Sequence, residues 1–436
     1  MNPKKKRVTK NKERVDREEQ SKYKFDPLGL EVKHPGTAVL LLQCQEQPIL
    51  LAAAAALSKY GSKSQGNLEV LFDLEIVASV IPLIEHENLF TRRFAAKLLA
   101  EMAAIPNVRN FLLDSTYYIP HFANILVNDK DLFMQEFSSA ILAEVSKDMF
   151  GVAQLLKQCL DMNFLFKRLQ SPDPDVKKNN LEIMHNLLRD STGAKEMIET
   201  KDFNLNLLYD LFDSPYREIQ GLALNIVGEL VSRNQDDHLQ NLFRRSNGLQ
   251  ALLKFLDKEE CVDLHSEVLR ILCLASDNPA TIDLLNDIGG IKRLLQYTQD
   301  TPNSKFFVEA LDVVVRLSHT PLGRKALYTY GIIDHLLLTL SGNVQSNIYE
   351  ISCHGIGMMT LHNDAAKELT ESNCIKNVLD ILKNENLKWT IRQAAMFALN
   401  RLLKCDMKNC HYFLDTHGQV DTLDIRDRLN SSRTVI

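Results

Sequence analysis

Two glycine-containing segments are the first places where this sequence could hold a catalytic or cofactor-binding group. The segment Gly61-Ser-Lys-Ser64-Gln-Gly66 resembles the Gly-x-Ser-x-Gly turn that presents a nucleophilic serine, but it has one residue too many and follows no predicted strand. The segment Gly355-Ile-Gly357 shares two glycines with a dinucleotide-binding fingerprint, but it lies inside a predicted helix and has no third glycine. We interpret the first segment as a loop and the second as a place where helices pack closely.

Cysteine and histidine residues gather near the C-terminus, where they could bind zinc: Cys405, Cys410, His411 and His417. A structural zinc site needs a tighter pair of ligands at a recognised spacing. Cys405 follows the apolar pattern of a predicted helix, so we expect it to be a buried thiol. The eight cysteines of the chain include no Cys-x-x-Cys pair, which indicates reduced thiols in an intracellular protein. The sequence therefore predicts no catalytic residue, no metal ion and no cofactor.

A basic cluster near the N-terminus, formed by Lys4, Lys5, Lys6 and Arg7, is typical both of nuclear-import signals and of solvated basic arms. Residues 1–24 hold ten Lys or Arg and four Asp or Glu, a balance of +6, whereas the whole chain carries −5. We predict a basic disordered arm over residues 1–24 and an acidic body after it. Because phosphate binding needs a basic folded surface, we expect no nucleic-acid partner.

An internal repeat predicts the elements that must position any functional side chain. An apolar residue opens the pattern apolar-x-x-apolar once every 42 to 44 residues. A period of this length is typical of armadillo and HEAT repeats, which run to about 40 to 47 residues. The eight anchors of the repeat are Val77, Ile119, Met162, Leu205, Leu249, Ile291, Ile333 and Ile375.

A second pattern follows each anchor after 18 to 20 residues. A small residue there begins the spacing i, i+3, i+4, i+7, as at Ala395, Ala398, Leu399 and Leu402. This spacing places the apolar side chains on one face of a helix. The leading small residue lets a neighbouring helix approach, so this long helix is predicted to form the core of each repeat.

Prolines and glycines mark the remaining helix boundaries of the repeat. Pro106, Pro279 and Pro321 are predicted to begin a short first helix, where the missing N–H costs no hydrogen bond. Gly248 and Gly290 come just before an anchor, where we expect the first helix to stop and the chain to bend. Each repeat therefore contains three helices, which favours the armadillo type over the two-helix HEAT type.

The predicted fold is all-α, a right-handed α-solenoid of about nine armadillo repeats. One repeat cannot bury its own apolar faces, so neighbouring repeats must stack into a continuous core. We expect the array to cover residues 25–423, with an atypical first repeat from Gly36 to Leu74. An incomplete last repeat and a polar tail over residues 424–436 are expected at the other end.

Side chains on the third helices are the candidate partner-binding residues. Peptide-binding armadillo proteins place an Asn there to bind the backbone amides of an extended peptide, but in this chain only Asn186 matches. Leu274 stands at this position in one repeat, and the repeat anchored at Ile333 is ambiguous between Met359 and Leu361. The charge changes from acidic to basic along the chain, which predicts a groove that favours basic segments early and acidic segments late; a solvated charged face is the alternative. The predicted groove residues are Glu101, Glu144, Asn186, Glu229, Arg270, Arg316 and Arg401.

Several segments resemble the armadillo repeat-containing protein 3 family. Phe25–Lys33 is similar to the segment that precedes the array in that family, and the loop Ser171-Pro-Asp-Pro-Asp-Val-Lys-Lys-Asn179 is similar to its inter-helix loop. Asp263-Leu-His265 and Gly289–Leu295 are similar in place and order, so the resemblance spans roughly residues 25 to 420. That family continues with further repeats and a transglutaminase-like C-terminal domain, so this sequence resembles a shortened form.

The resemblance implies a non-enzymatic protein-protein interaction scaffold that serves assembly or motility of the cilium or sperm flagellum. Its partners would be other proteins, such as axonemal or flagellar-transport components, and its place would be the cytoplasm and the cilium. The alternative is a nuclear-transport or nuclear regulatory adaptor, which the basic cluster Lys4–Arg7 and the fold would suit. An enzyme with an unrecognised site is not expected, because helix packing accounts for every strong pattern. We also expect no membrane span, since no apolar run reaches the ~18 to 20 residues that one needs.

Overall fold

The computed structural model describes residues 34–158, 162–233, 235–298, 306–342, 344–372 and 374–405. These residues form helices and no strand, as the repeat pattern predicts. The chain divides into two compact units, and the boundary lies between Leu230 and Val231. The predicted arm over residues 1–24 and the tail over 424–436 lie outside the described residues, so the predicted outer boundaries stay predictions.

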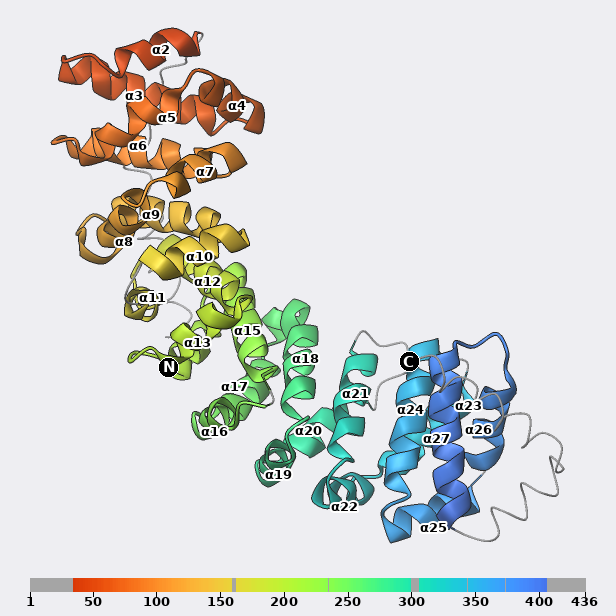
Figure 1. Cartoon of the computed structure of the whole chain (residues 1–436). Helices are drawn as coiled ribbons and strands as arrows, with labels where there is room; N and C mark the ends of the chain where they lie inside the picture. The colour runs from red at the N-terminus through yellow and green to blue at the C-terminus, as the bar shows by residue number, and fades with distance from the viewer. Residues whose placement is uncertain are drawn as a thin grey trace, which may run out of the picture. The chain divides into compact units, whose positions relative to one another are not determined.

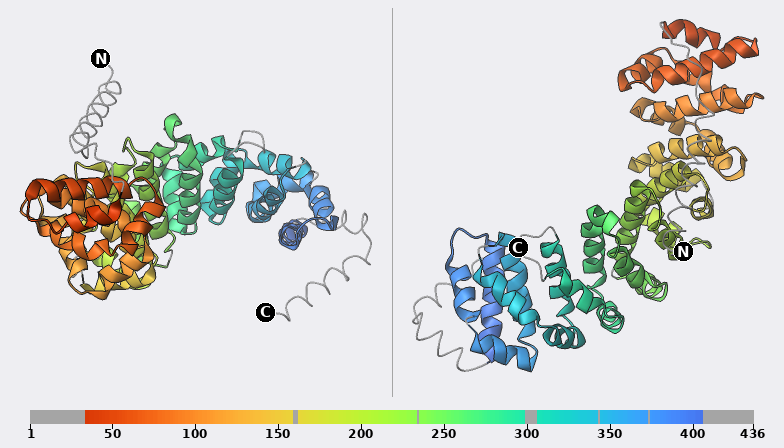
Figure 2. Two further views of the ribbon diagram at one scale, coloured as in Figure 1. Left: turned by 90° about the horizontal axis from the view of Figure 1, so that it is seen from above. Right: turned by 180° about the vertical axis from the view of Figure 1, so that it is seen from behind.

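The first unit stacks helix triplets, each with a short first helix, a second helix and a longer third helix (Figures 1 and 2). A helix pair precedes the triplets, and its longer helix has the place of a third helix. The helices are α2 (Pro35–Leu41), α3 (Gln47–Gly61), α4 (Gln65–Asp73), α5 (Ile76–Val80) with the 3-10 helix η1 (Ile81–Glu85), α6 (Leu89–Met102), α7 (Pro106–Asp114), α8 (Tyr118–Asn128), α9 (Leu132–Val145), α10 (Met149–Gln158), α11 (Asn163–Arg168), α12 (Pro174–Leu188), α13 (Ser191–Glu199), α14 (Leu205–Leu211) and α15 (Arg217–Val231).

The second unit repeats the same triplet, so the described residues contain eight triplets and one preceding pair, in agreement with about nine repeats. Its helices are α16 (Asp237–Arg245), α17 (Gly248–Phe255), the 3-10 helix η2 (Glu259–Leu264), α18 (His265–Ala275), α19 (Pro279–Asp287), α20 (Gly290–Gln296), α21 (Phe307–Leu317), α22 (Pro321–Thr329), α23 (Ile332–Ser341), α24 (Ser346–Met359), α25 (Asn363–Glu371), α26 (Cys374–Lys383) and α27 (Trp389–Cys405).

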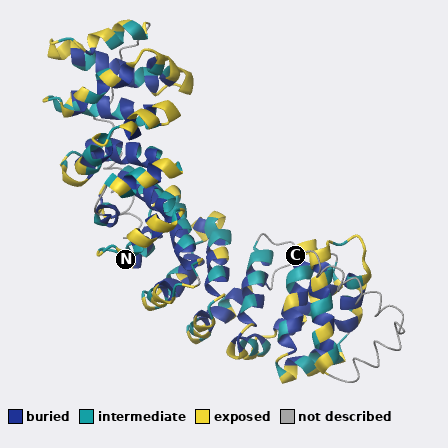
Figure 3. Ribbon diagram, viewed as in Figure 1, coloured by how far each residue is buried: buried dark blue, intermediate teal, exposed yellow. Residues whose placement is uncertain are grey.

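The eight anchor residues all lie at the start of a second helix, and all of them are buried. Third helices pack against third helices: α3 on α6, α6 on α9 and α9 on α12 in the first unit, and α18 on α21, α21 on α24 and α24 on α27 in the second. The buried residues, dark blue in Figure 3, follow these contacts within each unit. The period of the sequence is thus the stacking period of the structure, which confirms the all-α armadillo solenoid.

Glycines allow the third helices of the second unit to approach closely. A Cβ atom at Gly355 would lie 2.8 Å from Cγ2 of Val315, and one at Gly357 would lie 2.4 Å from the ring of Phe397. Both glycines are buried inside α24. The interpretation of Gly355-Ile-Gly357 as a packing site is therefore confirmed.

The first helices begin as predicted at Pro106, Pro279 and Pro321. The bend before the second helix, however, lies one residue earlier than predicted. At these two bends the left-handed residues are Asn247, with φ 60°, and Gly289, with φ 74°, rather than Gly248 and Gly290. Gly290 is glycine for a different reason, because a Cβ atom there would lie 2.8 Å from Cδ2 of Leu285.

The other glycine-containing segment, from Gly61 to Gly66, joins two helices. Gly61 ends α3, and Ser64 is the N-cap of α4, where its hydroxyl oxygen accepts a hydrogen bond from the Asn67 amide at 3.3 Å. Ser64 therefore caps the N-terminus of α4 in the turn that connects the two helices. Across the described part of the chain, no helix combines the length and apolar character that crossing a bilayer would take.

Candidate functional site

One side chain recurs at the same register near the end of every third helix, and we call these residues the third-helix row. Each is half-buried, and the residue that follows it is buried in all eight repeats. In the repeat anchored at Ile333 the row residue is Met358, one position before the window predicted from the sequence, because Met359 is buried. The row is Glu101, Glu144, Asn186 and Glu229 in the first unit, and Leu274, Arg316, Met358 and Arg401 in the second.

Glu101 on α6 contacts the preceding repeat. The hydroxyl of Ser62, the C-cap residue of α3, donates to Oε1 of Glu101 at 2.6 Å, and Nζ of Lys97 lies 3.9 Å from the same oxygen. Burial raises the pKa of the Glu101 carboxyl, although the hydrogen bond from Ser62 and the charge of Lys97 act in the opposite direction. This carboxylate is thus held between two repeats.

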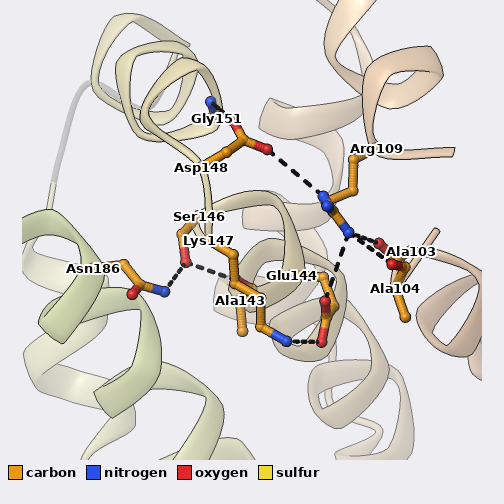
Figure 4. Close-up of polar contacts among 10 residues, drawn as sticks. All are labelled: Ala103, Ala104, Arg109, Ala143, Glu144, Ser146, Lys147, Asp148, Gly151 and Asn186. Atoms are coloured by element: carbon orange, nitrogen blue, oxygen red, sulfur yellow. Dashed lines mark hydrogen bonds and ion pairs between the residues drawn. The ribbon is translucent and has the colours of Figure 1, made fainter. Parts of the chain in front are cut away.

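Glu144 on α9 belongs to a charged network (Figure 4). It forms an ion pair with Lys147, and its Oε2 atom lies 4.0 Å from Nη1 of Arg109. Arg109 donates to the carbonyl oxygens of Ala103 at 3.0 Å and Ala104 at 2.8 Å, where α6 ends. A cation at these exposed carbonyls is favourable, so Glu144 stabilises the guanidinium that caps the preceding third helix.

The side-chain amide of Asn186 on α12 contacts the preceding repeat. Its Nδ2 atom donates to Oγ of Ser146 at 2.9 Å, and Ser146 is the C-cap residue of α9 (Figure 4). The Ser146 hydroxyl in turn donates to the carbonyl oxygen of Ala143 at 2.7 Å. The one residue that matches the peptide-binding Asn therefore links two repeats.

The basic row residues of the second unit also have nearby partners. Arg316 on α21 forms an ion pair with Asp277, which follows the C-cap of α18, and its Nε atom lies 3.7 Å from Oδ1 of Asp312. The guanidinium of Arg401 lies 5.5 Å from the ring centroid of Phe397. Arg270 is not in the row but one turn earlier on α18, where it pairs with Glu267 at 2.5 Å.

These contacts show what the row does within each unit. Glu101, Asn186 and Arg316 each bind a residue at the carboxyl end of the preceding third helix, and Glu144 acts there through Arg109. Local partners of opposite sign offset several of the charges from which the acidic-to-basic change was predicted. Whether a partner protein uses these residues stays a prediction.

A second set of side chains lies three residues after the row and was missed from the sequence. All eight are exposed, so this column faces solvent more fully than the row itself. The signal was present in the sequence, because the column has the same period as the row, but its residue types vary. The exposed column is Ala104, Lys147 and Arg189 in the first unit, and Ser232, Asp277, His319, Leu361 and Lys404 in the second.

Three carboxylates of the first unit lie close enough to bind a cation: Glu136, Asp173 and Asp175 bring their oxygens within 4.8 Å of one another. Asp173 is the N-cap of α12, and its Oδ1 atom accepts from the amides of Asp175 at 2.8 Å and Val176 at 3.2 Å. Helix capping therefore accounts for the position of Asp173 without a metal.

The buried-thiol interpretation of Cys405 is wrong, because this residue is the last of α27 and is exposed. In the other repeats the equivalent position, four residues after the row, lies beyond the end of the third helix. It is buried at Ile105 and Thr320 and half-buried in the remaining repeats. Cys410, His411 and His417 lie outside the described residues, as do Lys4, Lys5, Lys6 and Arg7.

The second unit also has an open hollow of about 500 Å³ on its second helices α17 and α20. Lys254, Lys292 and Arg293 line it together with Asp257, with which Arg293 forms an ion pair. None of the predicted groove residues lines this hollow.

Comparisons with known proteins agree with the repeat. No family model matches the chain. Human Armadillo repeat-containing protein 3 is 28% identical over 394 residues, which are 90% of this chain and 44% of that protein. The predicted resemblance is thereby confirmed, and the chain spans less than half the length of this relative.

Two solved structures show the same fold. An engineered protein aligns with a TM-score of 0.73 at 18% identity, over 88% of this chain and 92% of its own. A chain from a structure concerned with a phosphorylation switch in the interaction between cadherin and β-catenin aligns with a TM-score of 0.69 at 16% identity, over 88% of this chain and 75% of its own. At these identities the likeness concerns the fold alone.

Proposed function

We propose that this chain is a non-enzymatic scaffold that holds other proteins against the third-helix rows and the exposed column beside them. The armadillo repeat supports an interaction scaffold, because stacked repeats present side chains at regular spacing on a long surface. The solved structure that aligns with a TM-score of 0.69 concerns an interaction between two proteins, cadherin and β-catenin. A protein partner is the corresponding ligand class for this chain.

The observation that carries the proposal is the exposed column, in which a solvent-facing side chain recurs in every repeat next to a structurally fixed row. Row residues link neighbouring repeats through hydrogen bonds such as that from Asn186 to Ser146, while column residues such as Lys147 and Arg189 are exposed to solvent. A partner would therefore be recognised by side-chain charge rather than by an Asn ladder on its backbone. Charged rim contacts of this kind act mainly on association rate and depend on salt.

The cilium or sperm flagellum is the cellular site that we propose, on the basis of the similarity to human Armadillo repeat-containing protein 3. The test is the location of the tagged full-length chain in motile-ciliated cells, beside a variant with Lys4, Lys5, Lys6 and Arg7 replaced by Ser. We expect signal in the cytoplasm and along the cilium for both chains. A nuclear signal that disappears in the variant would instead support the nuclear adaptor.

A further inference from the structure

The second helix triplet carries a group of aromatic rings on its first and second helices, and Glu85 of the first triplet contacts them; we call this group the aromatic corner. It consists of Phe111 at α7, Tyr117, Tyr118 and His121 at the start of α8, and Glu85 at the end of η1. Tyr117 is 54% exposed and Phe111 is 41% exposed. Exposed tyrosine and phenylalanine of this size are enriched where proteins bind proteins.

Contacts between the rings hold the corner in one arrangement. Tyr117 stacks on His121 at 5.2 Å between centroids, and Phe111 stacks on Tyr118 at 5.9 Å. The Tyr117 hydroxyl donates to Oε1 of Glu85 at 2.6 Å, and Nε2 of His121 lies 3.5 Å from the same oxygen. The corner thus joins two repeats, and little side-chain entropy would be lost when a partner covers it.

The two stretches of chain that contribute the corner are acidic. No Lys or Arg occurs in residues 64–91 or 110–129, although the chain has 51 in 436 residues. The same two stretches hold seven acidic residues, of which the ones on or next to α4, η1 and α7 are exposed. Arg92, just beyond the first stretch, donates to the carbonyl oxygen of His86 at 3.2 Å. The seven are Glu69, Asp73, Glu75, Glu85, Glu87, Asp114 and Asp129.

We propose that the aromatic corner is a second docking surface, separate from the third-helix row, and that it binds an arginine-rich segment of a partner protein. An arginine side chain matches both parts of this surface. Its guanidinium stacks on exposed tyrosine or phenylalanine and pairs with carboxylates such as Glu85 and Asp114. An acidic segment would be repelled by the same carboxylates, and so would nucleic acid.

The test uses the full-length chain and a fluorescein-labelled peptide in which Arg alternates with Ser and Leu, with binding measured by fluorescence anisotropy. We expect the double variant Phe111→Ala with Tyr117→Ala to bind this peptide about tenfold more weakly than the wild type. Tyr330→Ala is the matched control, because Tyr330 is also exposed but lies in the second unit, and it should bind as the wild type does. Thermal melting of each variant checks that these surface changes leave the fold intact.

Three results would overturn the inference. The first is equal affinity of the wild type and the double variant for the Arg peptide. The second is equal affinity of the wild type for the Arg peptide and for a peptide in which Glu replaces every Arg. The third is a several-fold gain in affinity for the Arg peptide when Lys4, Lys5, Lys6 and Arg7 are replaced by Ser. The last result would mean that the chain's own arm covers the corner. Glu371→Lys, an exposed change at the end of α25 that lies outside the third-helix row and the exposed column, should leave peptide binding unchanged.

Discussion

At the scale of single residues, Glu101, Asn186 and Arg316 each find a partner 39 or 40 residues earlier in the chain. This separation is close to the repeat period, so each polar contact joins one repeat to the preceding one. A hydrogen bond or ion pair offsets part of the desolvation cost of a half-buried polar group. These contacts therefore link neighbouring repeats as well as shaping the surface of the row.

Burial of the cysteine thiols leads to a labelling prediction. Burial raises the pKa of Cys353 to about 12, and it also raises the pKa values of Cys374 and Cys273. Because the thiolate is the reactive form, iodoacetamide at pH 8 should modify exposed Cys405 first and leave these three unmodified in the folded chain. Peptide mass spectrometry checks the order, and rapid modification of Cys353 without denaturant would contradict it.

Glu101 leads to a prediction about pH. Burial raises the folded-state pKa of the Glu101 carboxyl above the usual 4.5, so the folded chain favours the protonated form. The stability that this preference adds is fully present below pH 4.5 and is lost as the pH rises through the folded-state pKa. Glu101→Gln should therefore gain stability relative to the wild type between pH 4 and pH 7, as measured by urea unfolding. Ser62→Ala removes the hydrogen bond that lowers this pKa, so its loss of stability should grow with pH. A gain for Glu101→Gln that is the same at both pH values would refute this role.

At the scale of helices, close approach of α24 and α27 depends on one missing side chain. Gly357→Ala would place a methyl group 2.4 Å from the Phe397 ring, and overpacking of this kind costs about 1 to 3 kcal/mol. Gly66→Ala on α4 is the matched control, since nothing lies within 4 Å of its Cβ position, and it should stabilise the chain by about 0.5 kcal/mol. Urea unfolding measures the stability of both variants. An equal change in the free energy of unfolding for the two variants would show that α24 and α27 do not need a glycine at position 357 to pack.

Helix-scale features were largely predictable because they depend on local residue types. Pro106 begins α7 because proline fits a first helical turn, and the anchor Ile119 is buried because its apolar pattern recurs with the stacking period. The left-handed bend was placed one residue late, because Gly289 and Gly290 are both glycine and only one needs a positive φ. The first has the conformational role, and the second has the packing role.

The candidate site was less predictable than the fold. The register of the row followed from apolar spacing, but the bond from Asn186 to Ser146 depends on how two helix ends meet, which no local pattern encodes. Cys405 was predicted to be buried because it extends an apolar pattern, although α27 ends at that residue. The aromatic corner was missed because Phe111 and Tyr117 come from the end of one helix and the turn before the next.

At the scale of the molecule, stability in each unit comes from contacts between neighbouring repeats, such as α6 with α9 and α21 with α24. An array of this kind keeps its side chains at fixed intervals without a single central core. Protein partners would then bind the third-helix row and the exposed column through charged side chains, while the aromatic corner would bind an arginine-rich segment at a separate surface.

The most direct measurement of the central claim is the dissociation constant, at low and high salt, of the protein that the full-length chain enriches most from motile-ciliated tissue. The chains to compare are the wild type, the double variant Glu144→Lys with Glu229→Lys, and the control Tyr330→Ala. If the third-helix row binds partners by charge, the double variant should bind at least about tenfold more weakly at low salt, and the difference should shrink at high salt, while the control binds as the wild type does. Equal affinity of the wild type and the double variant at both salt concentrations would contradict the account.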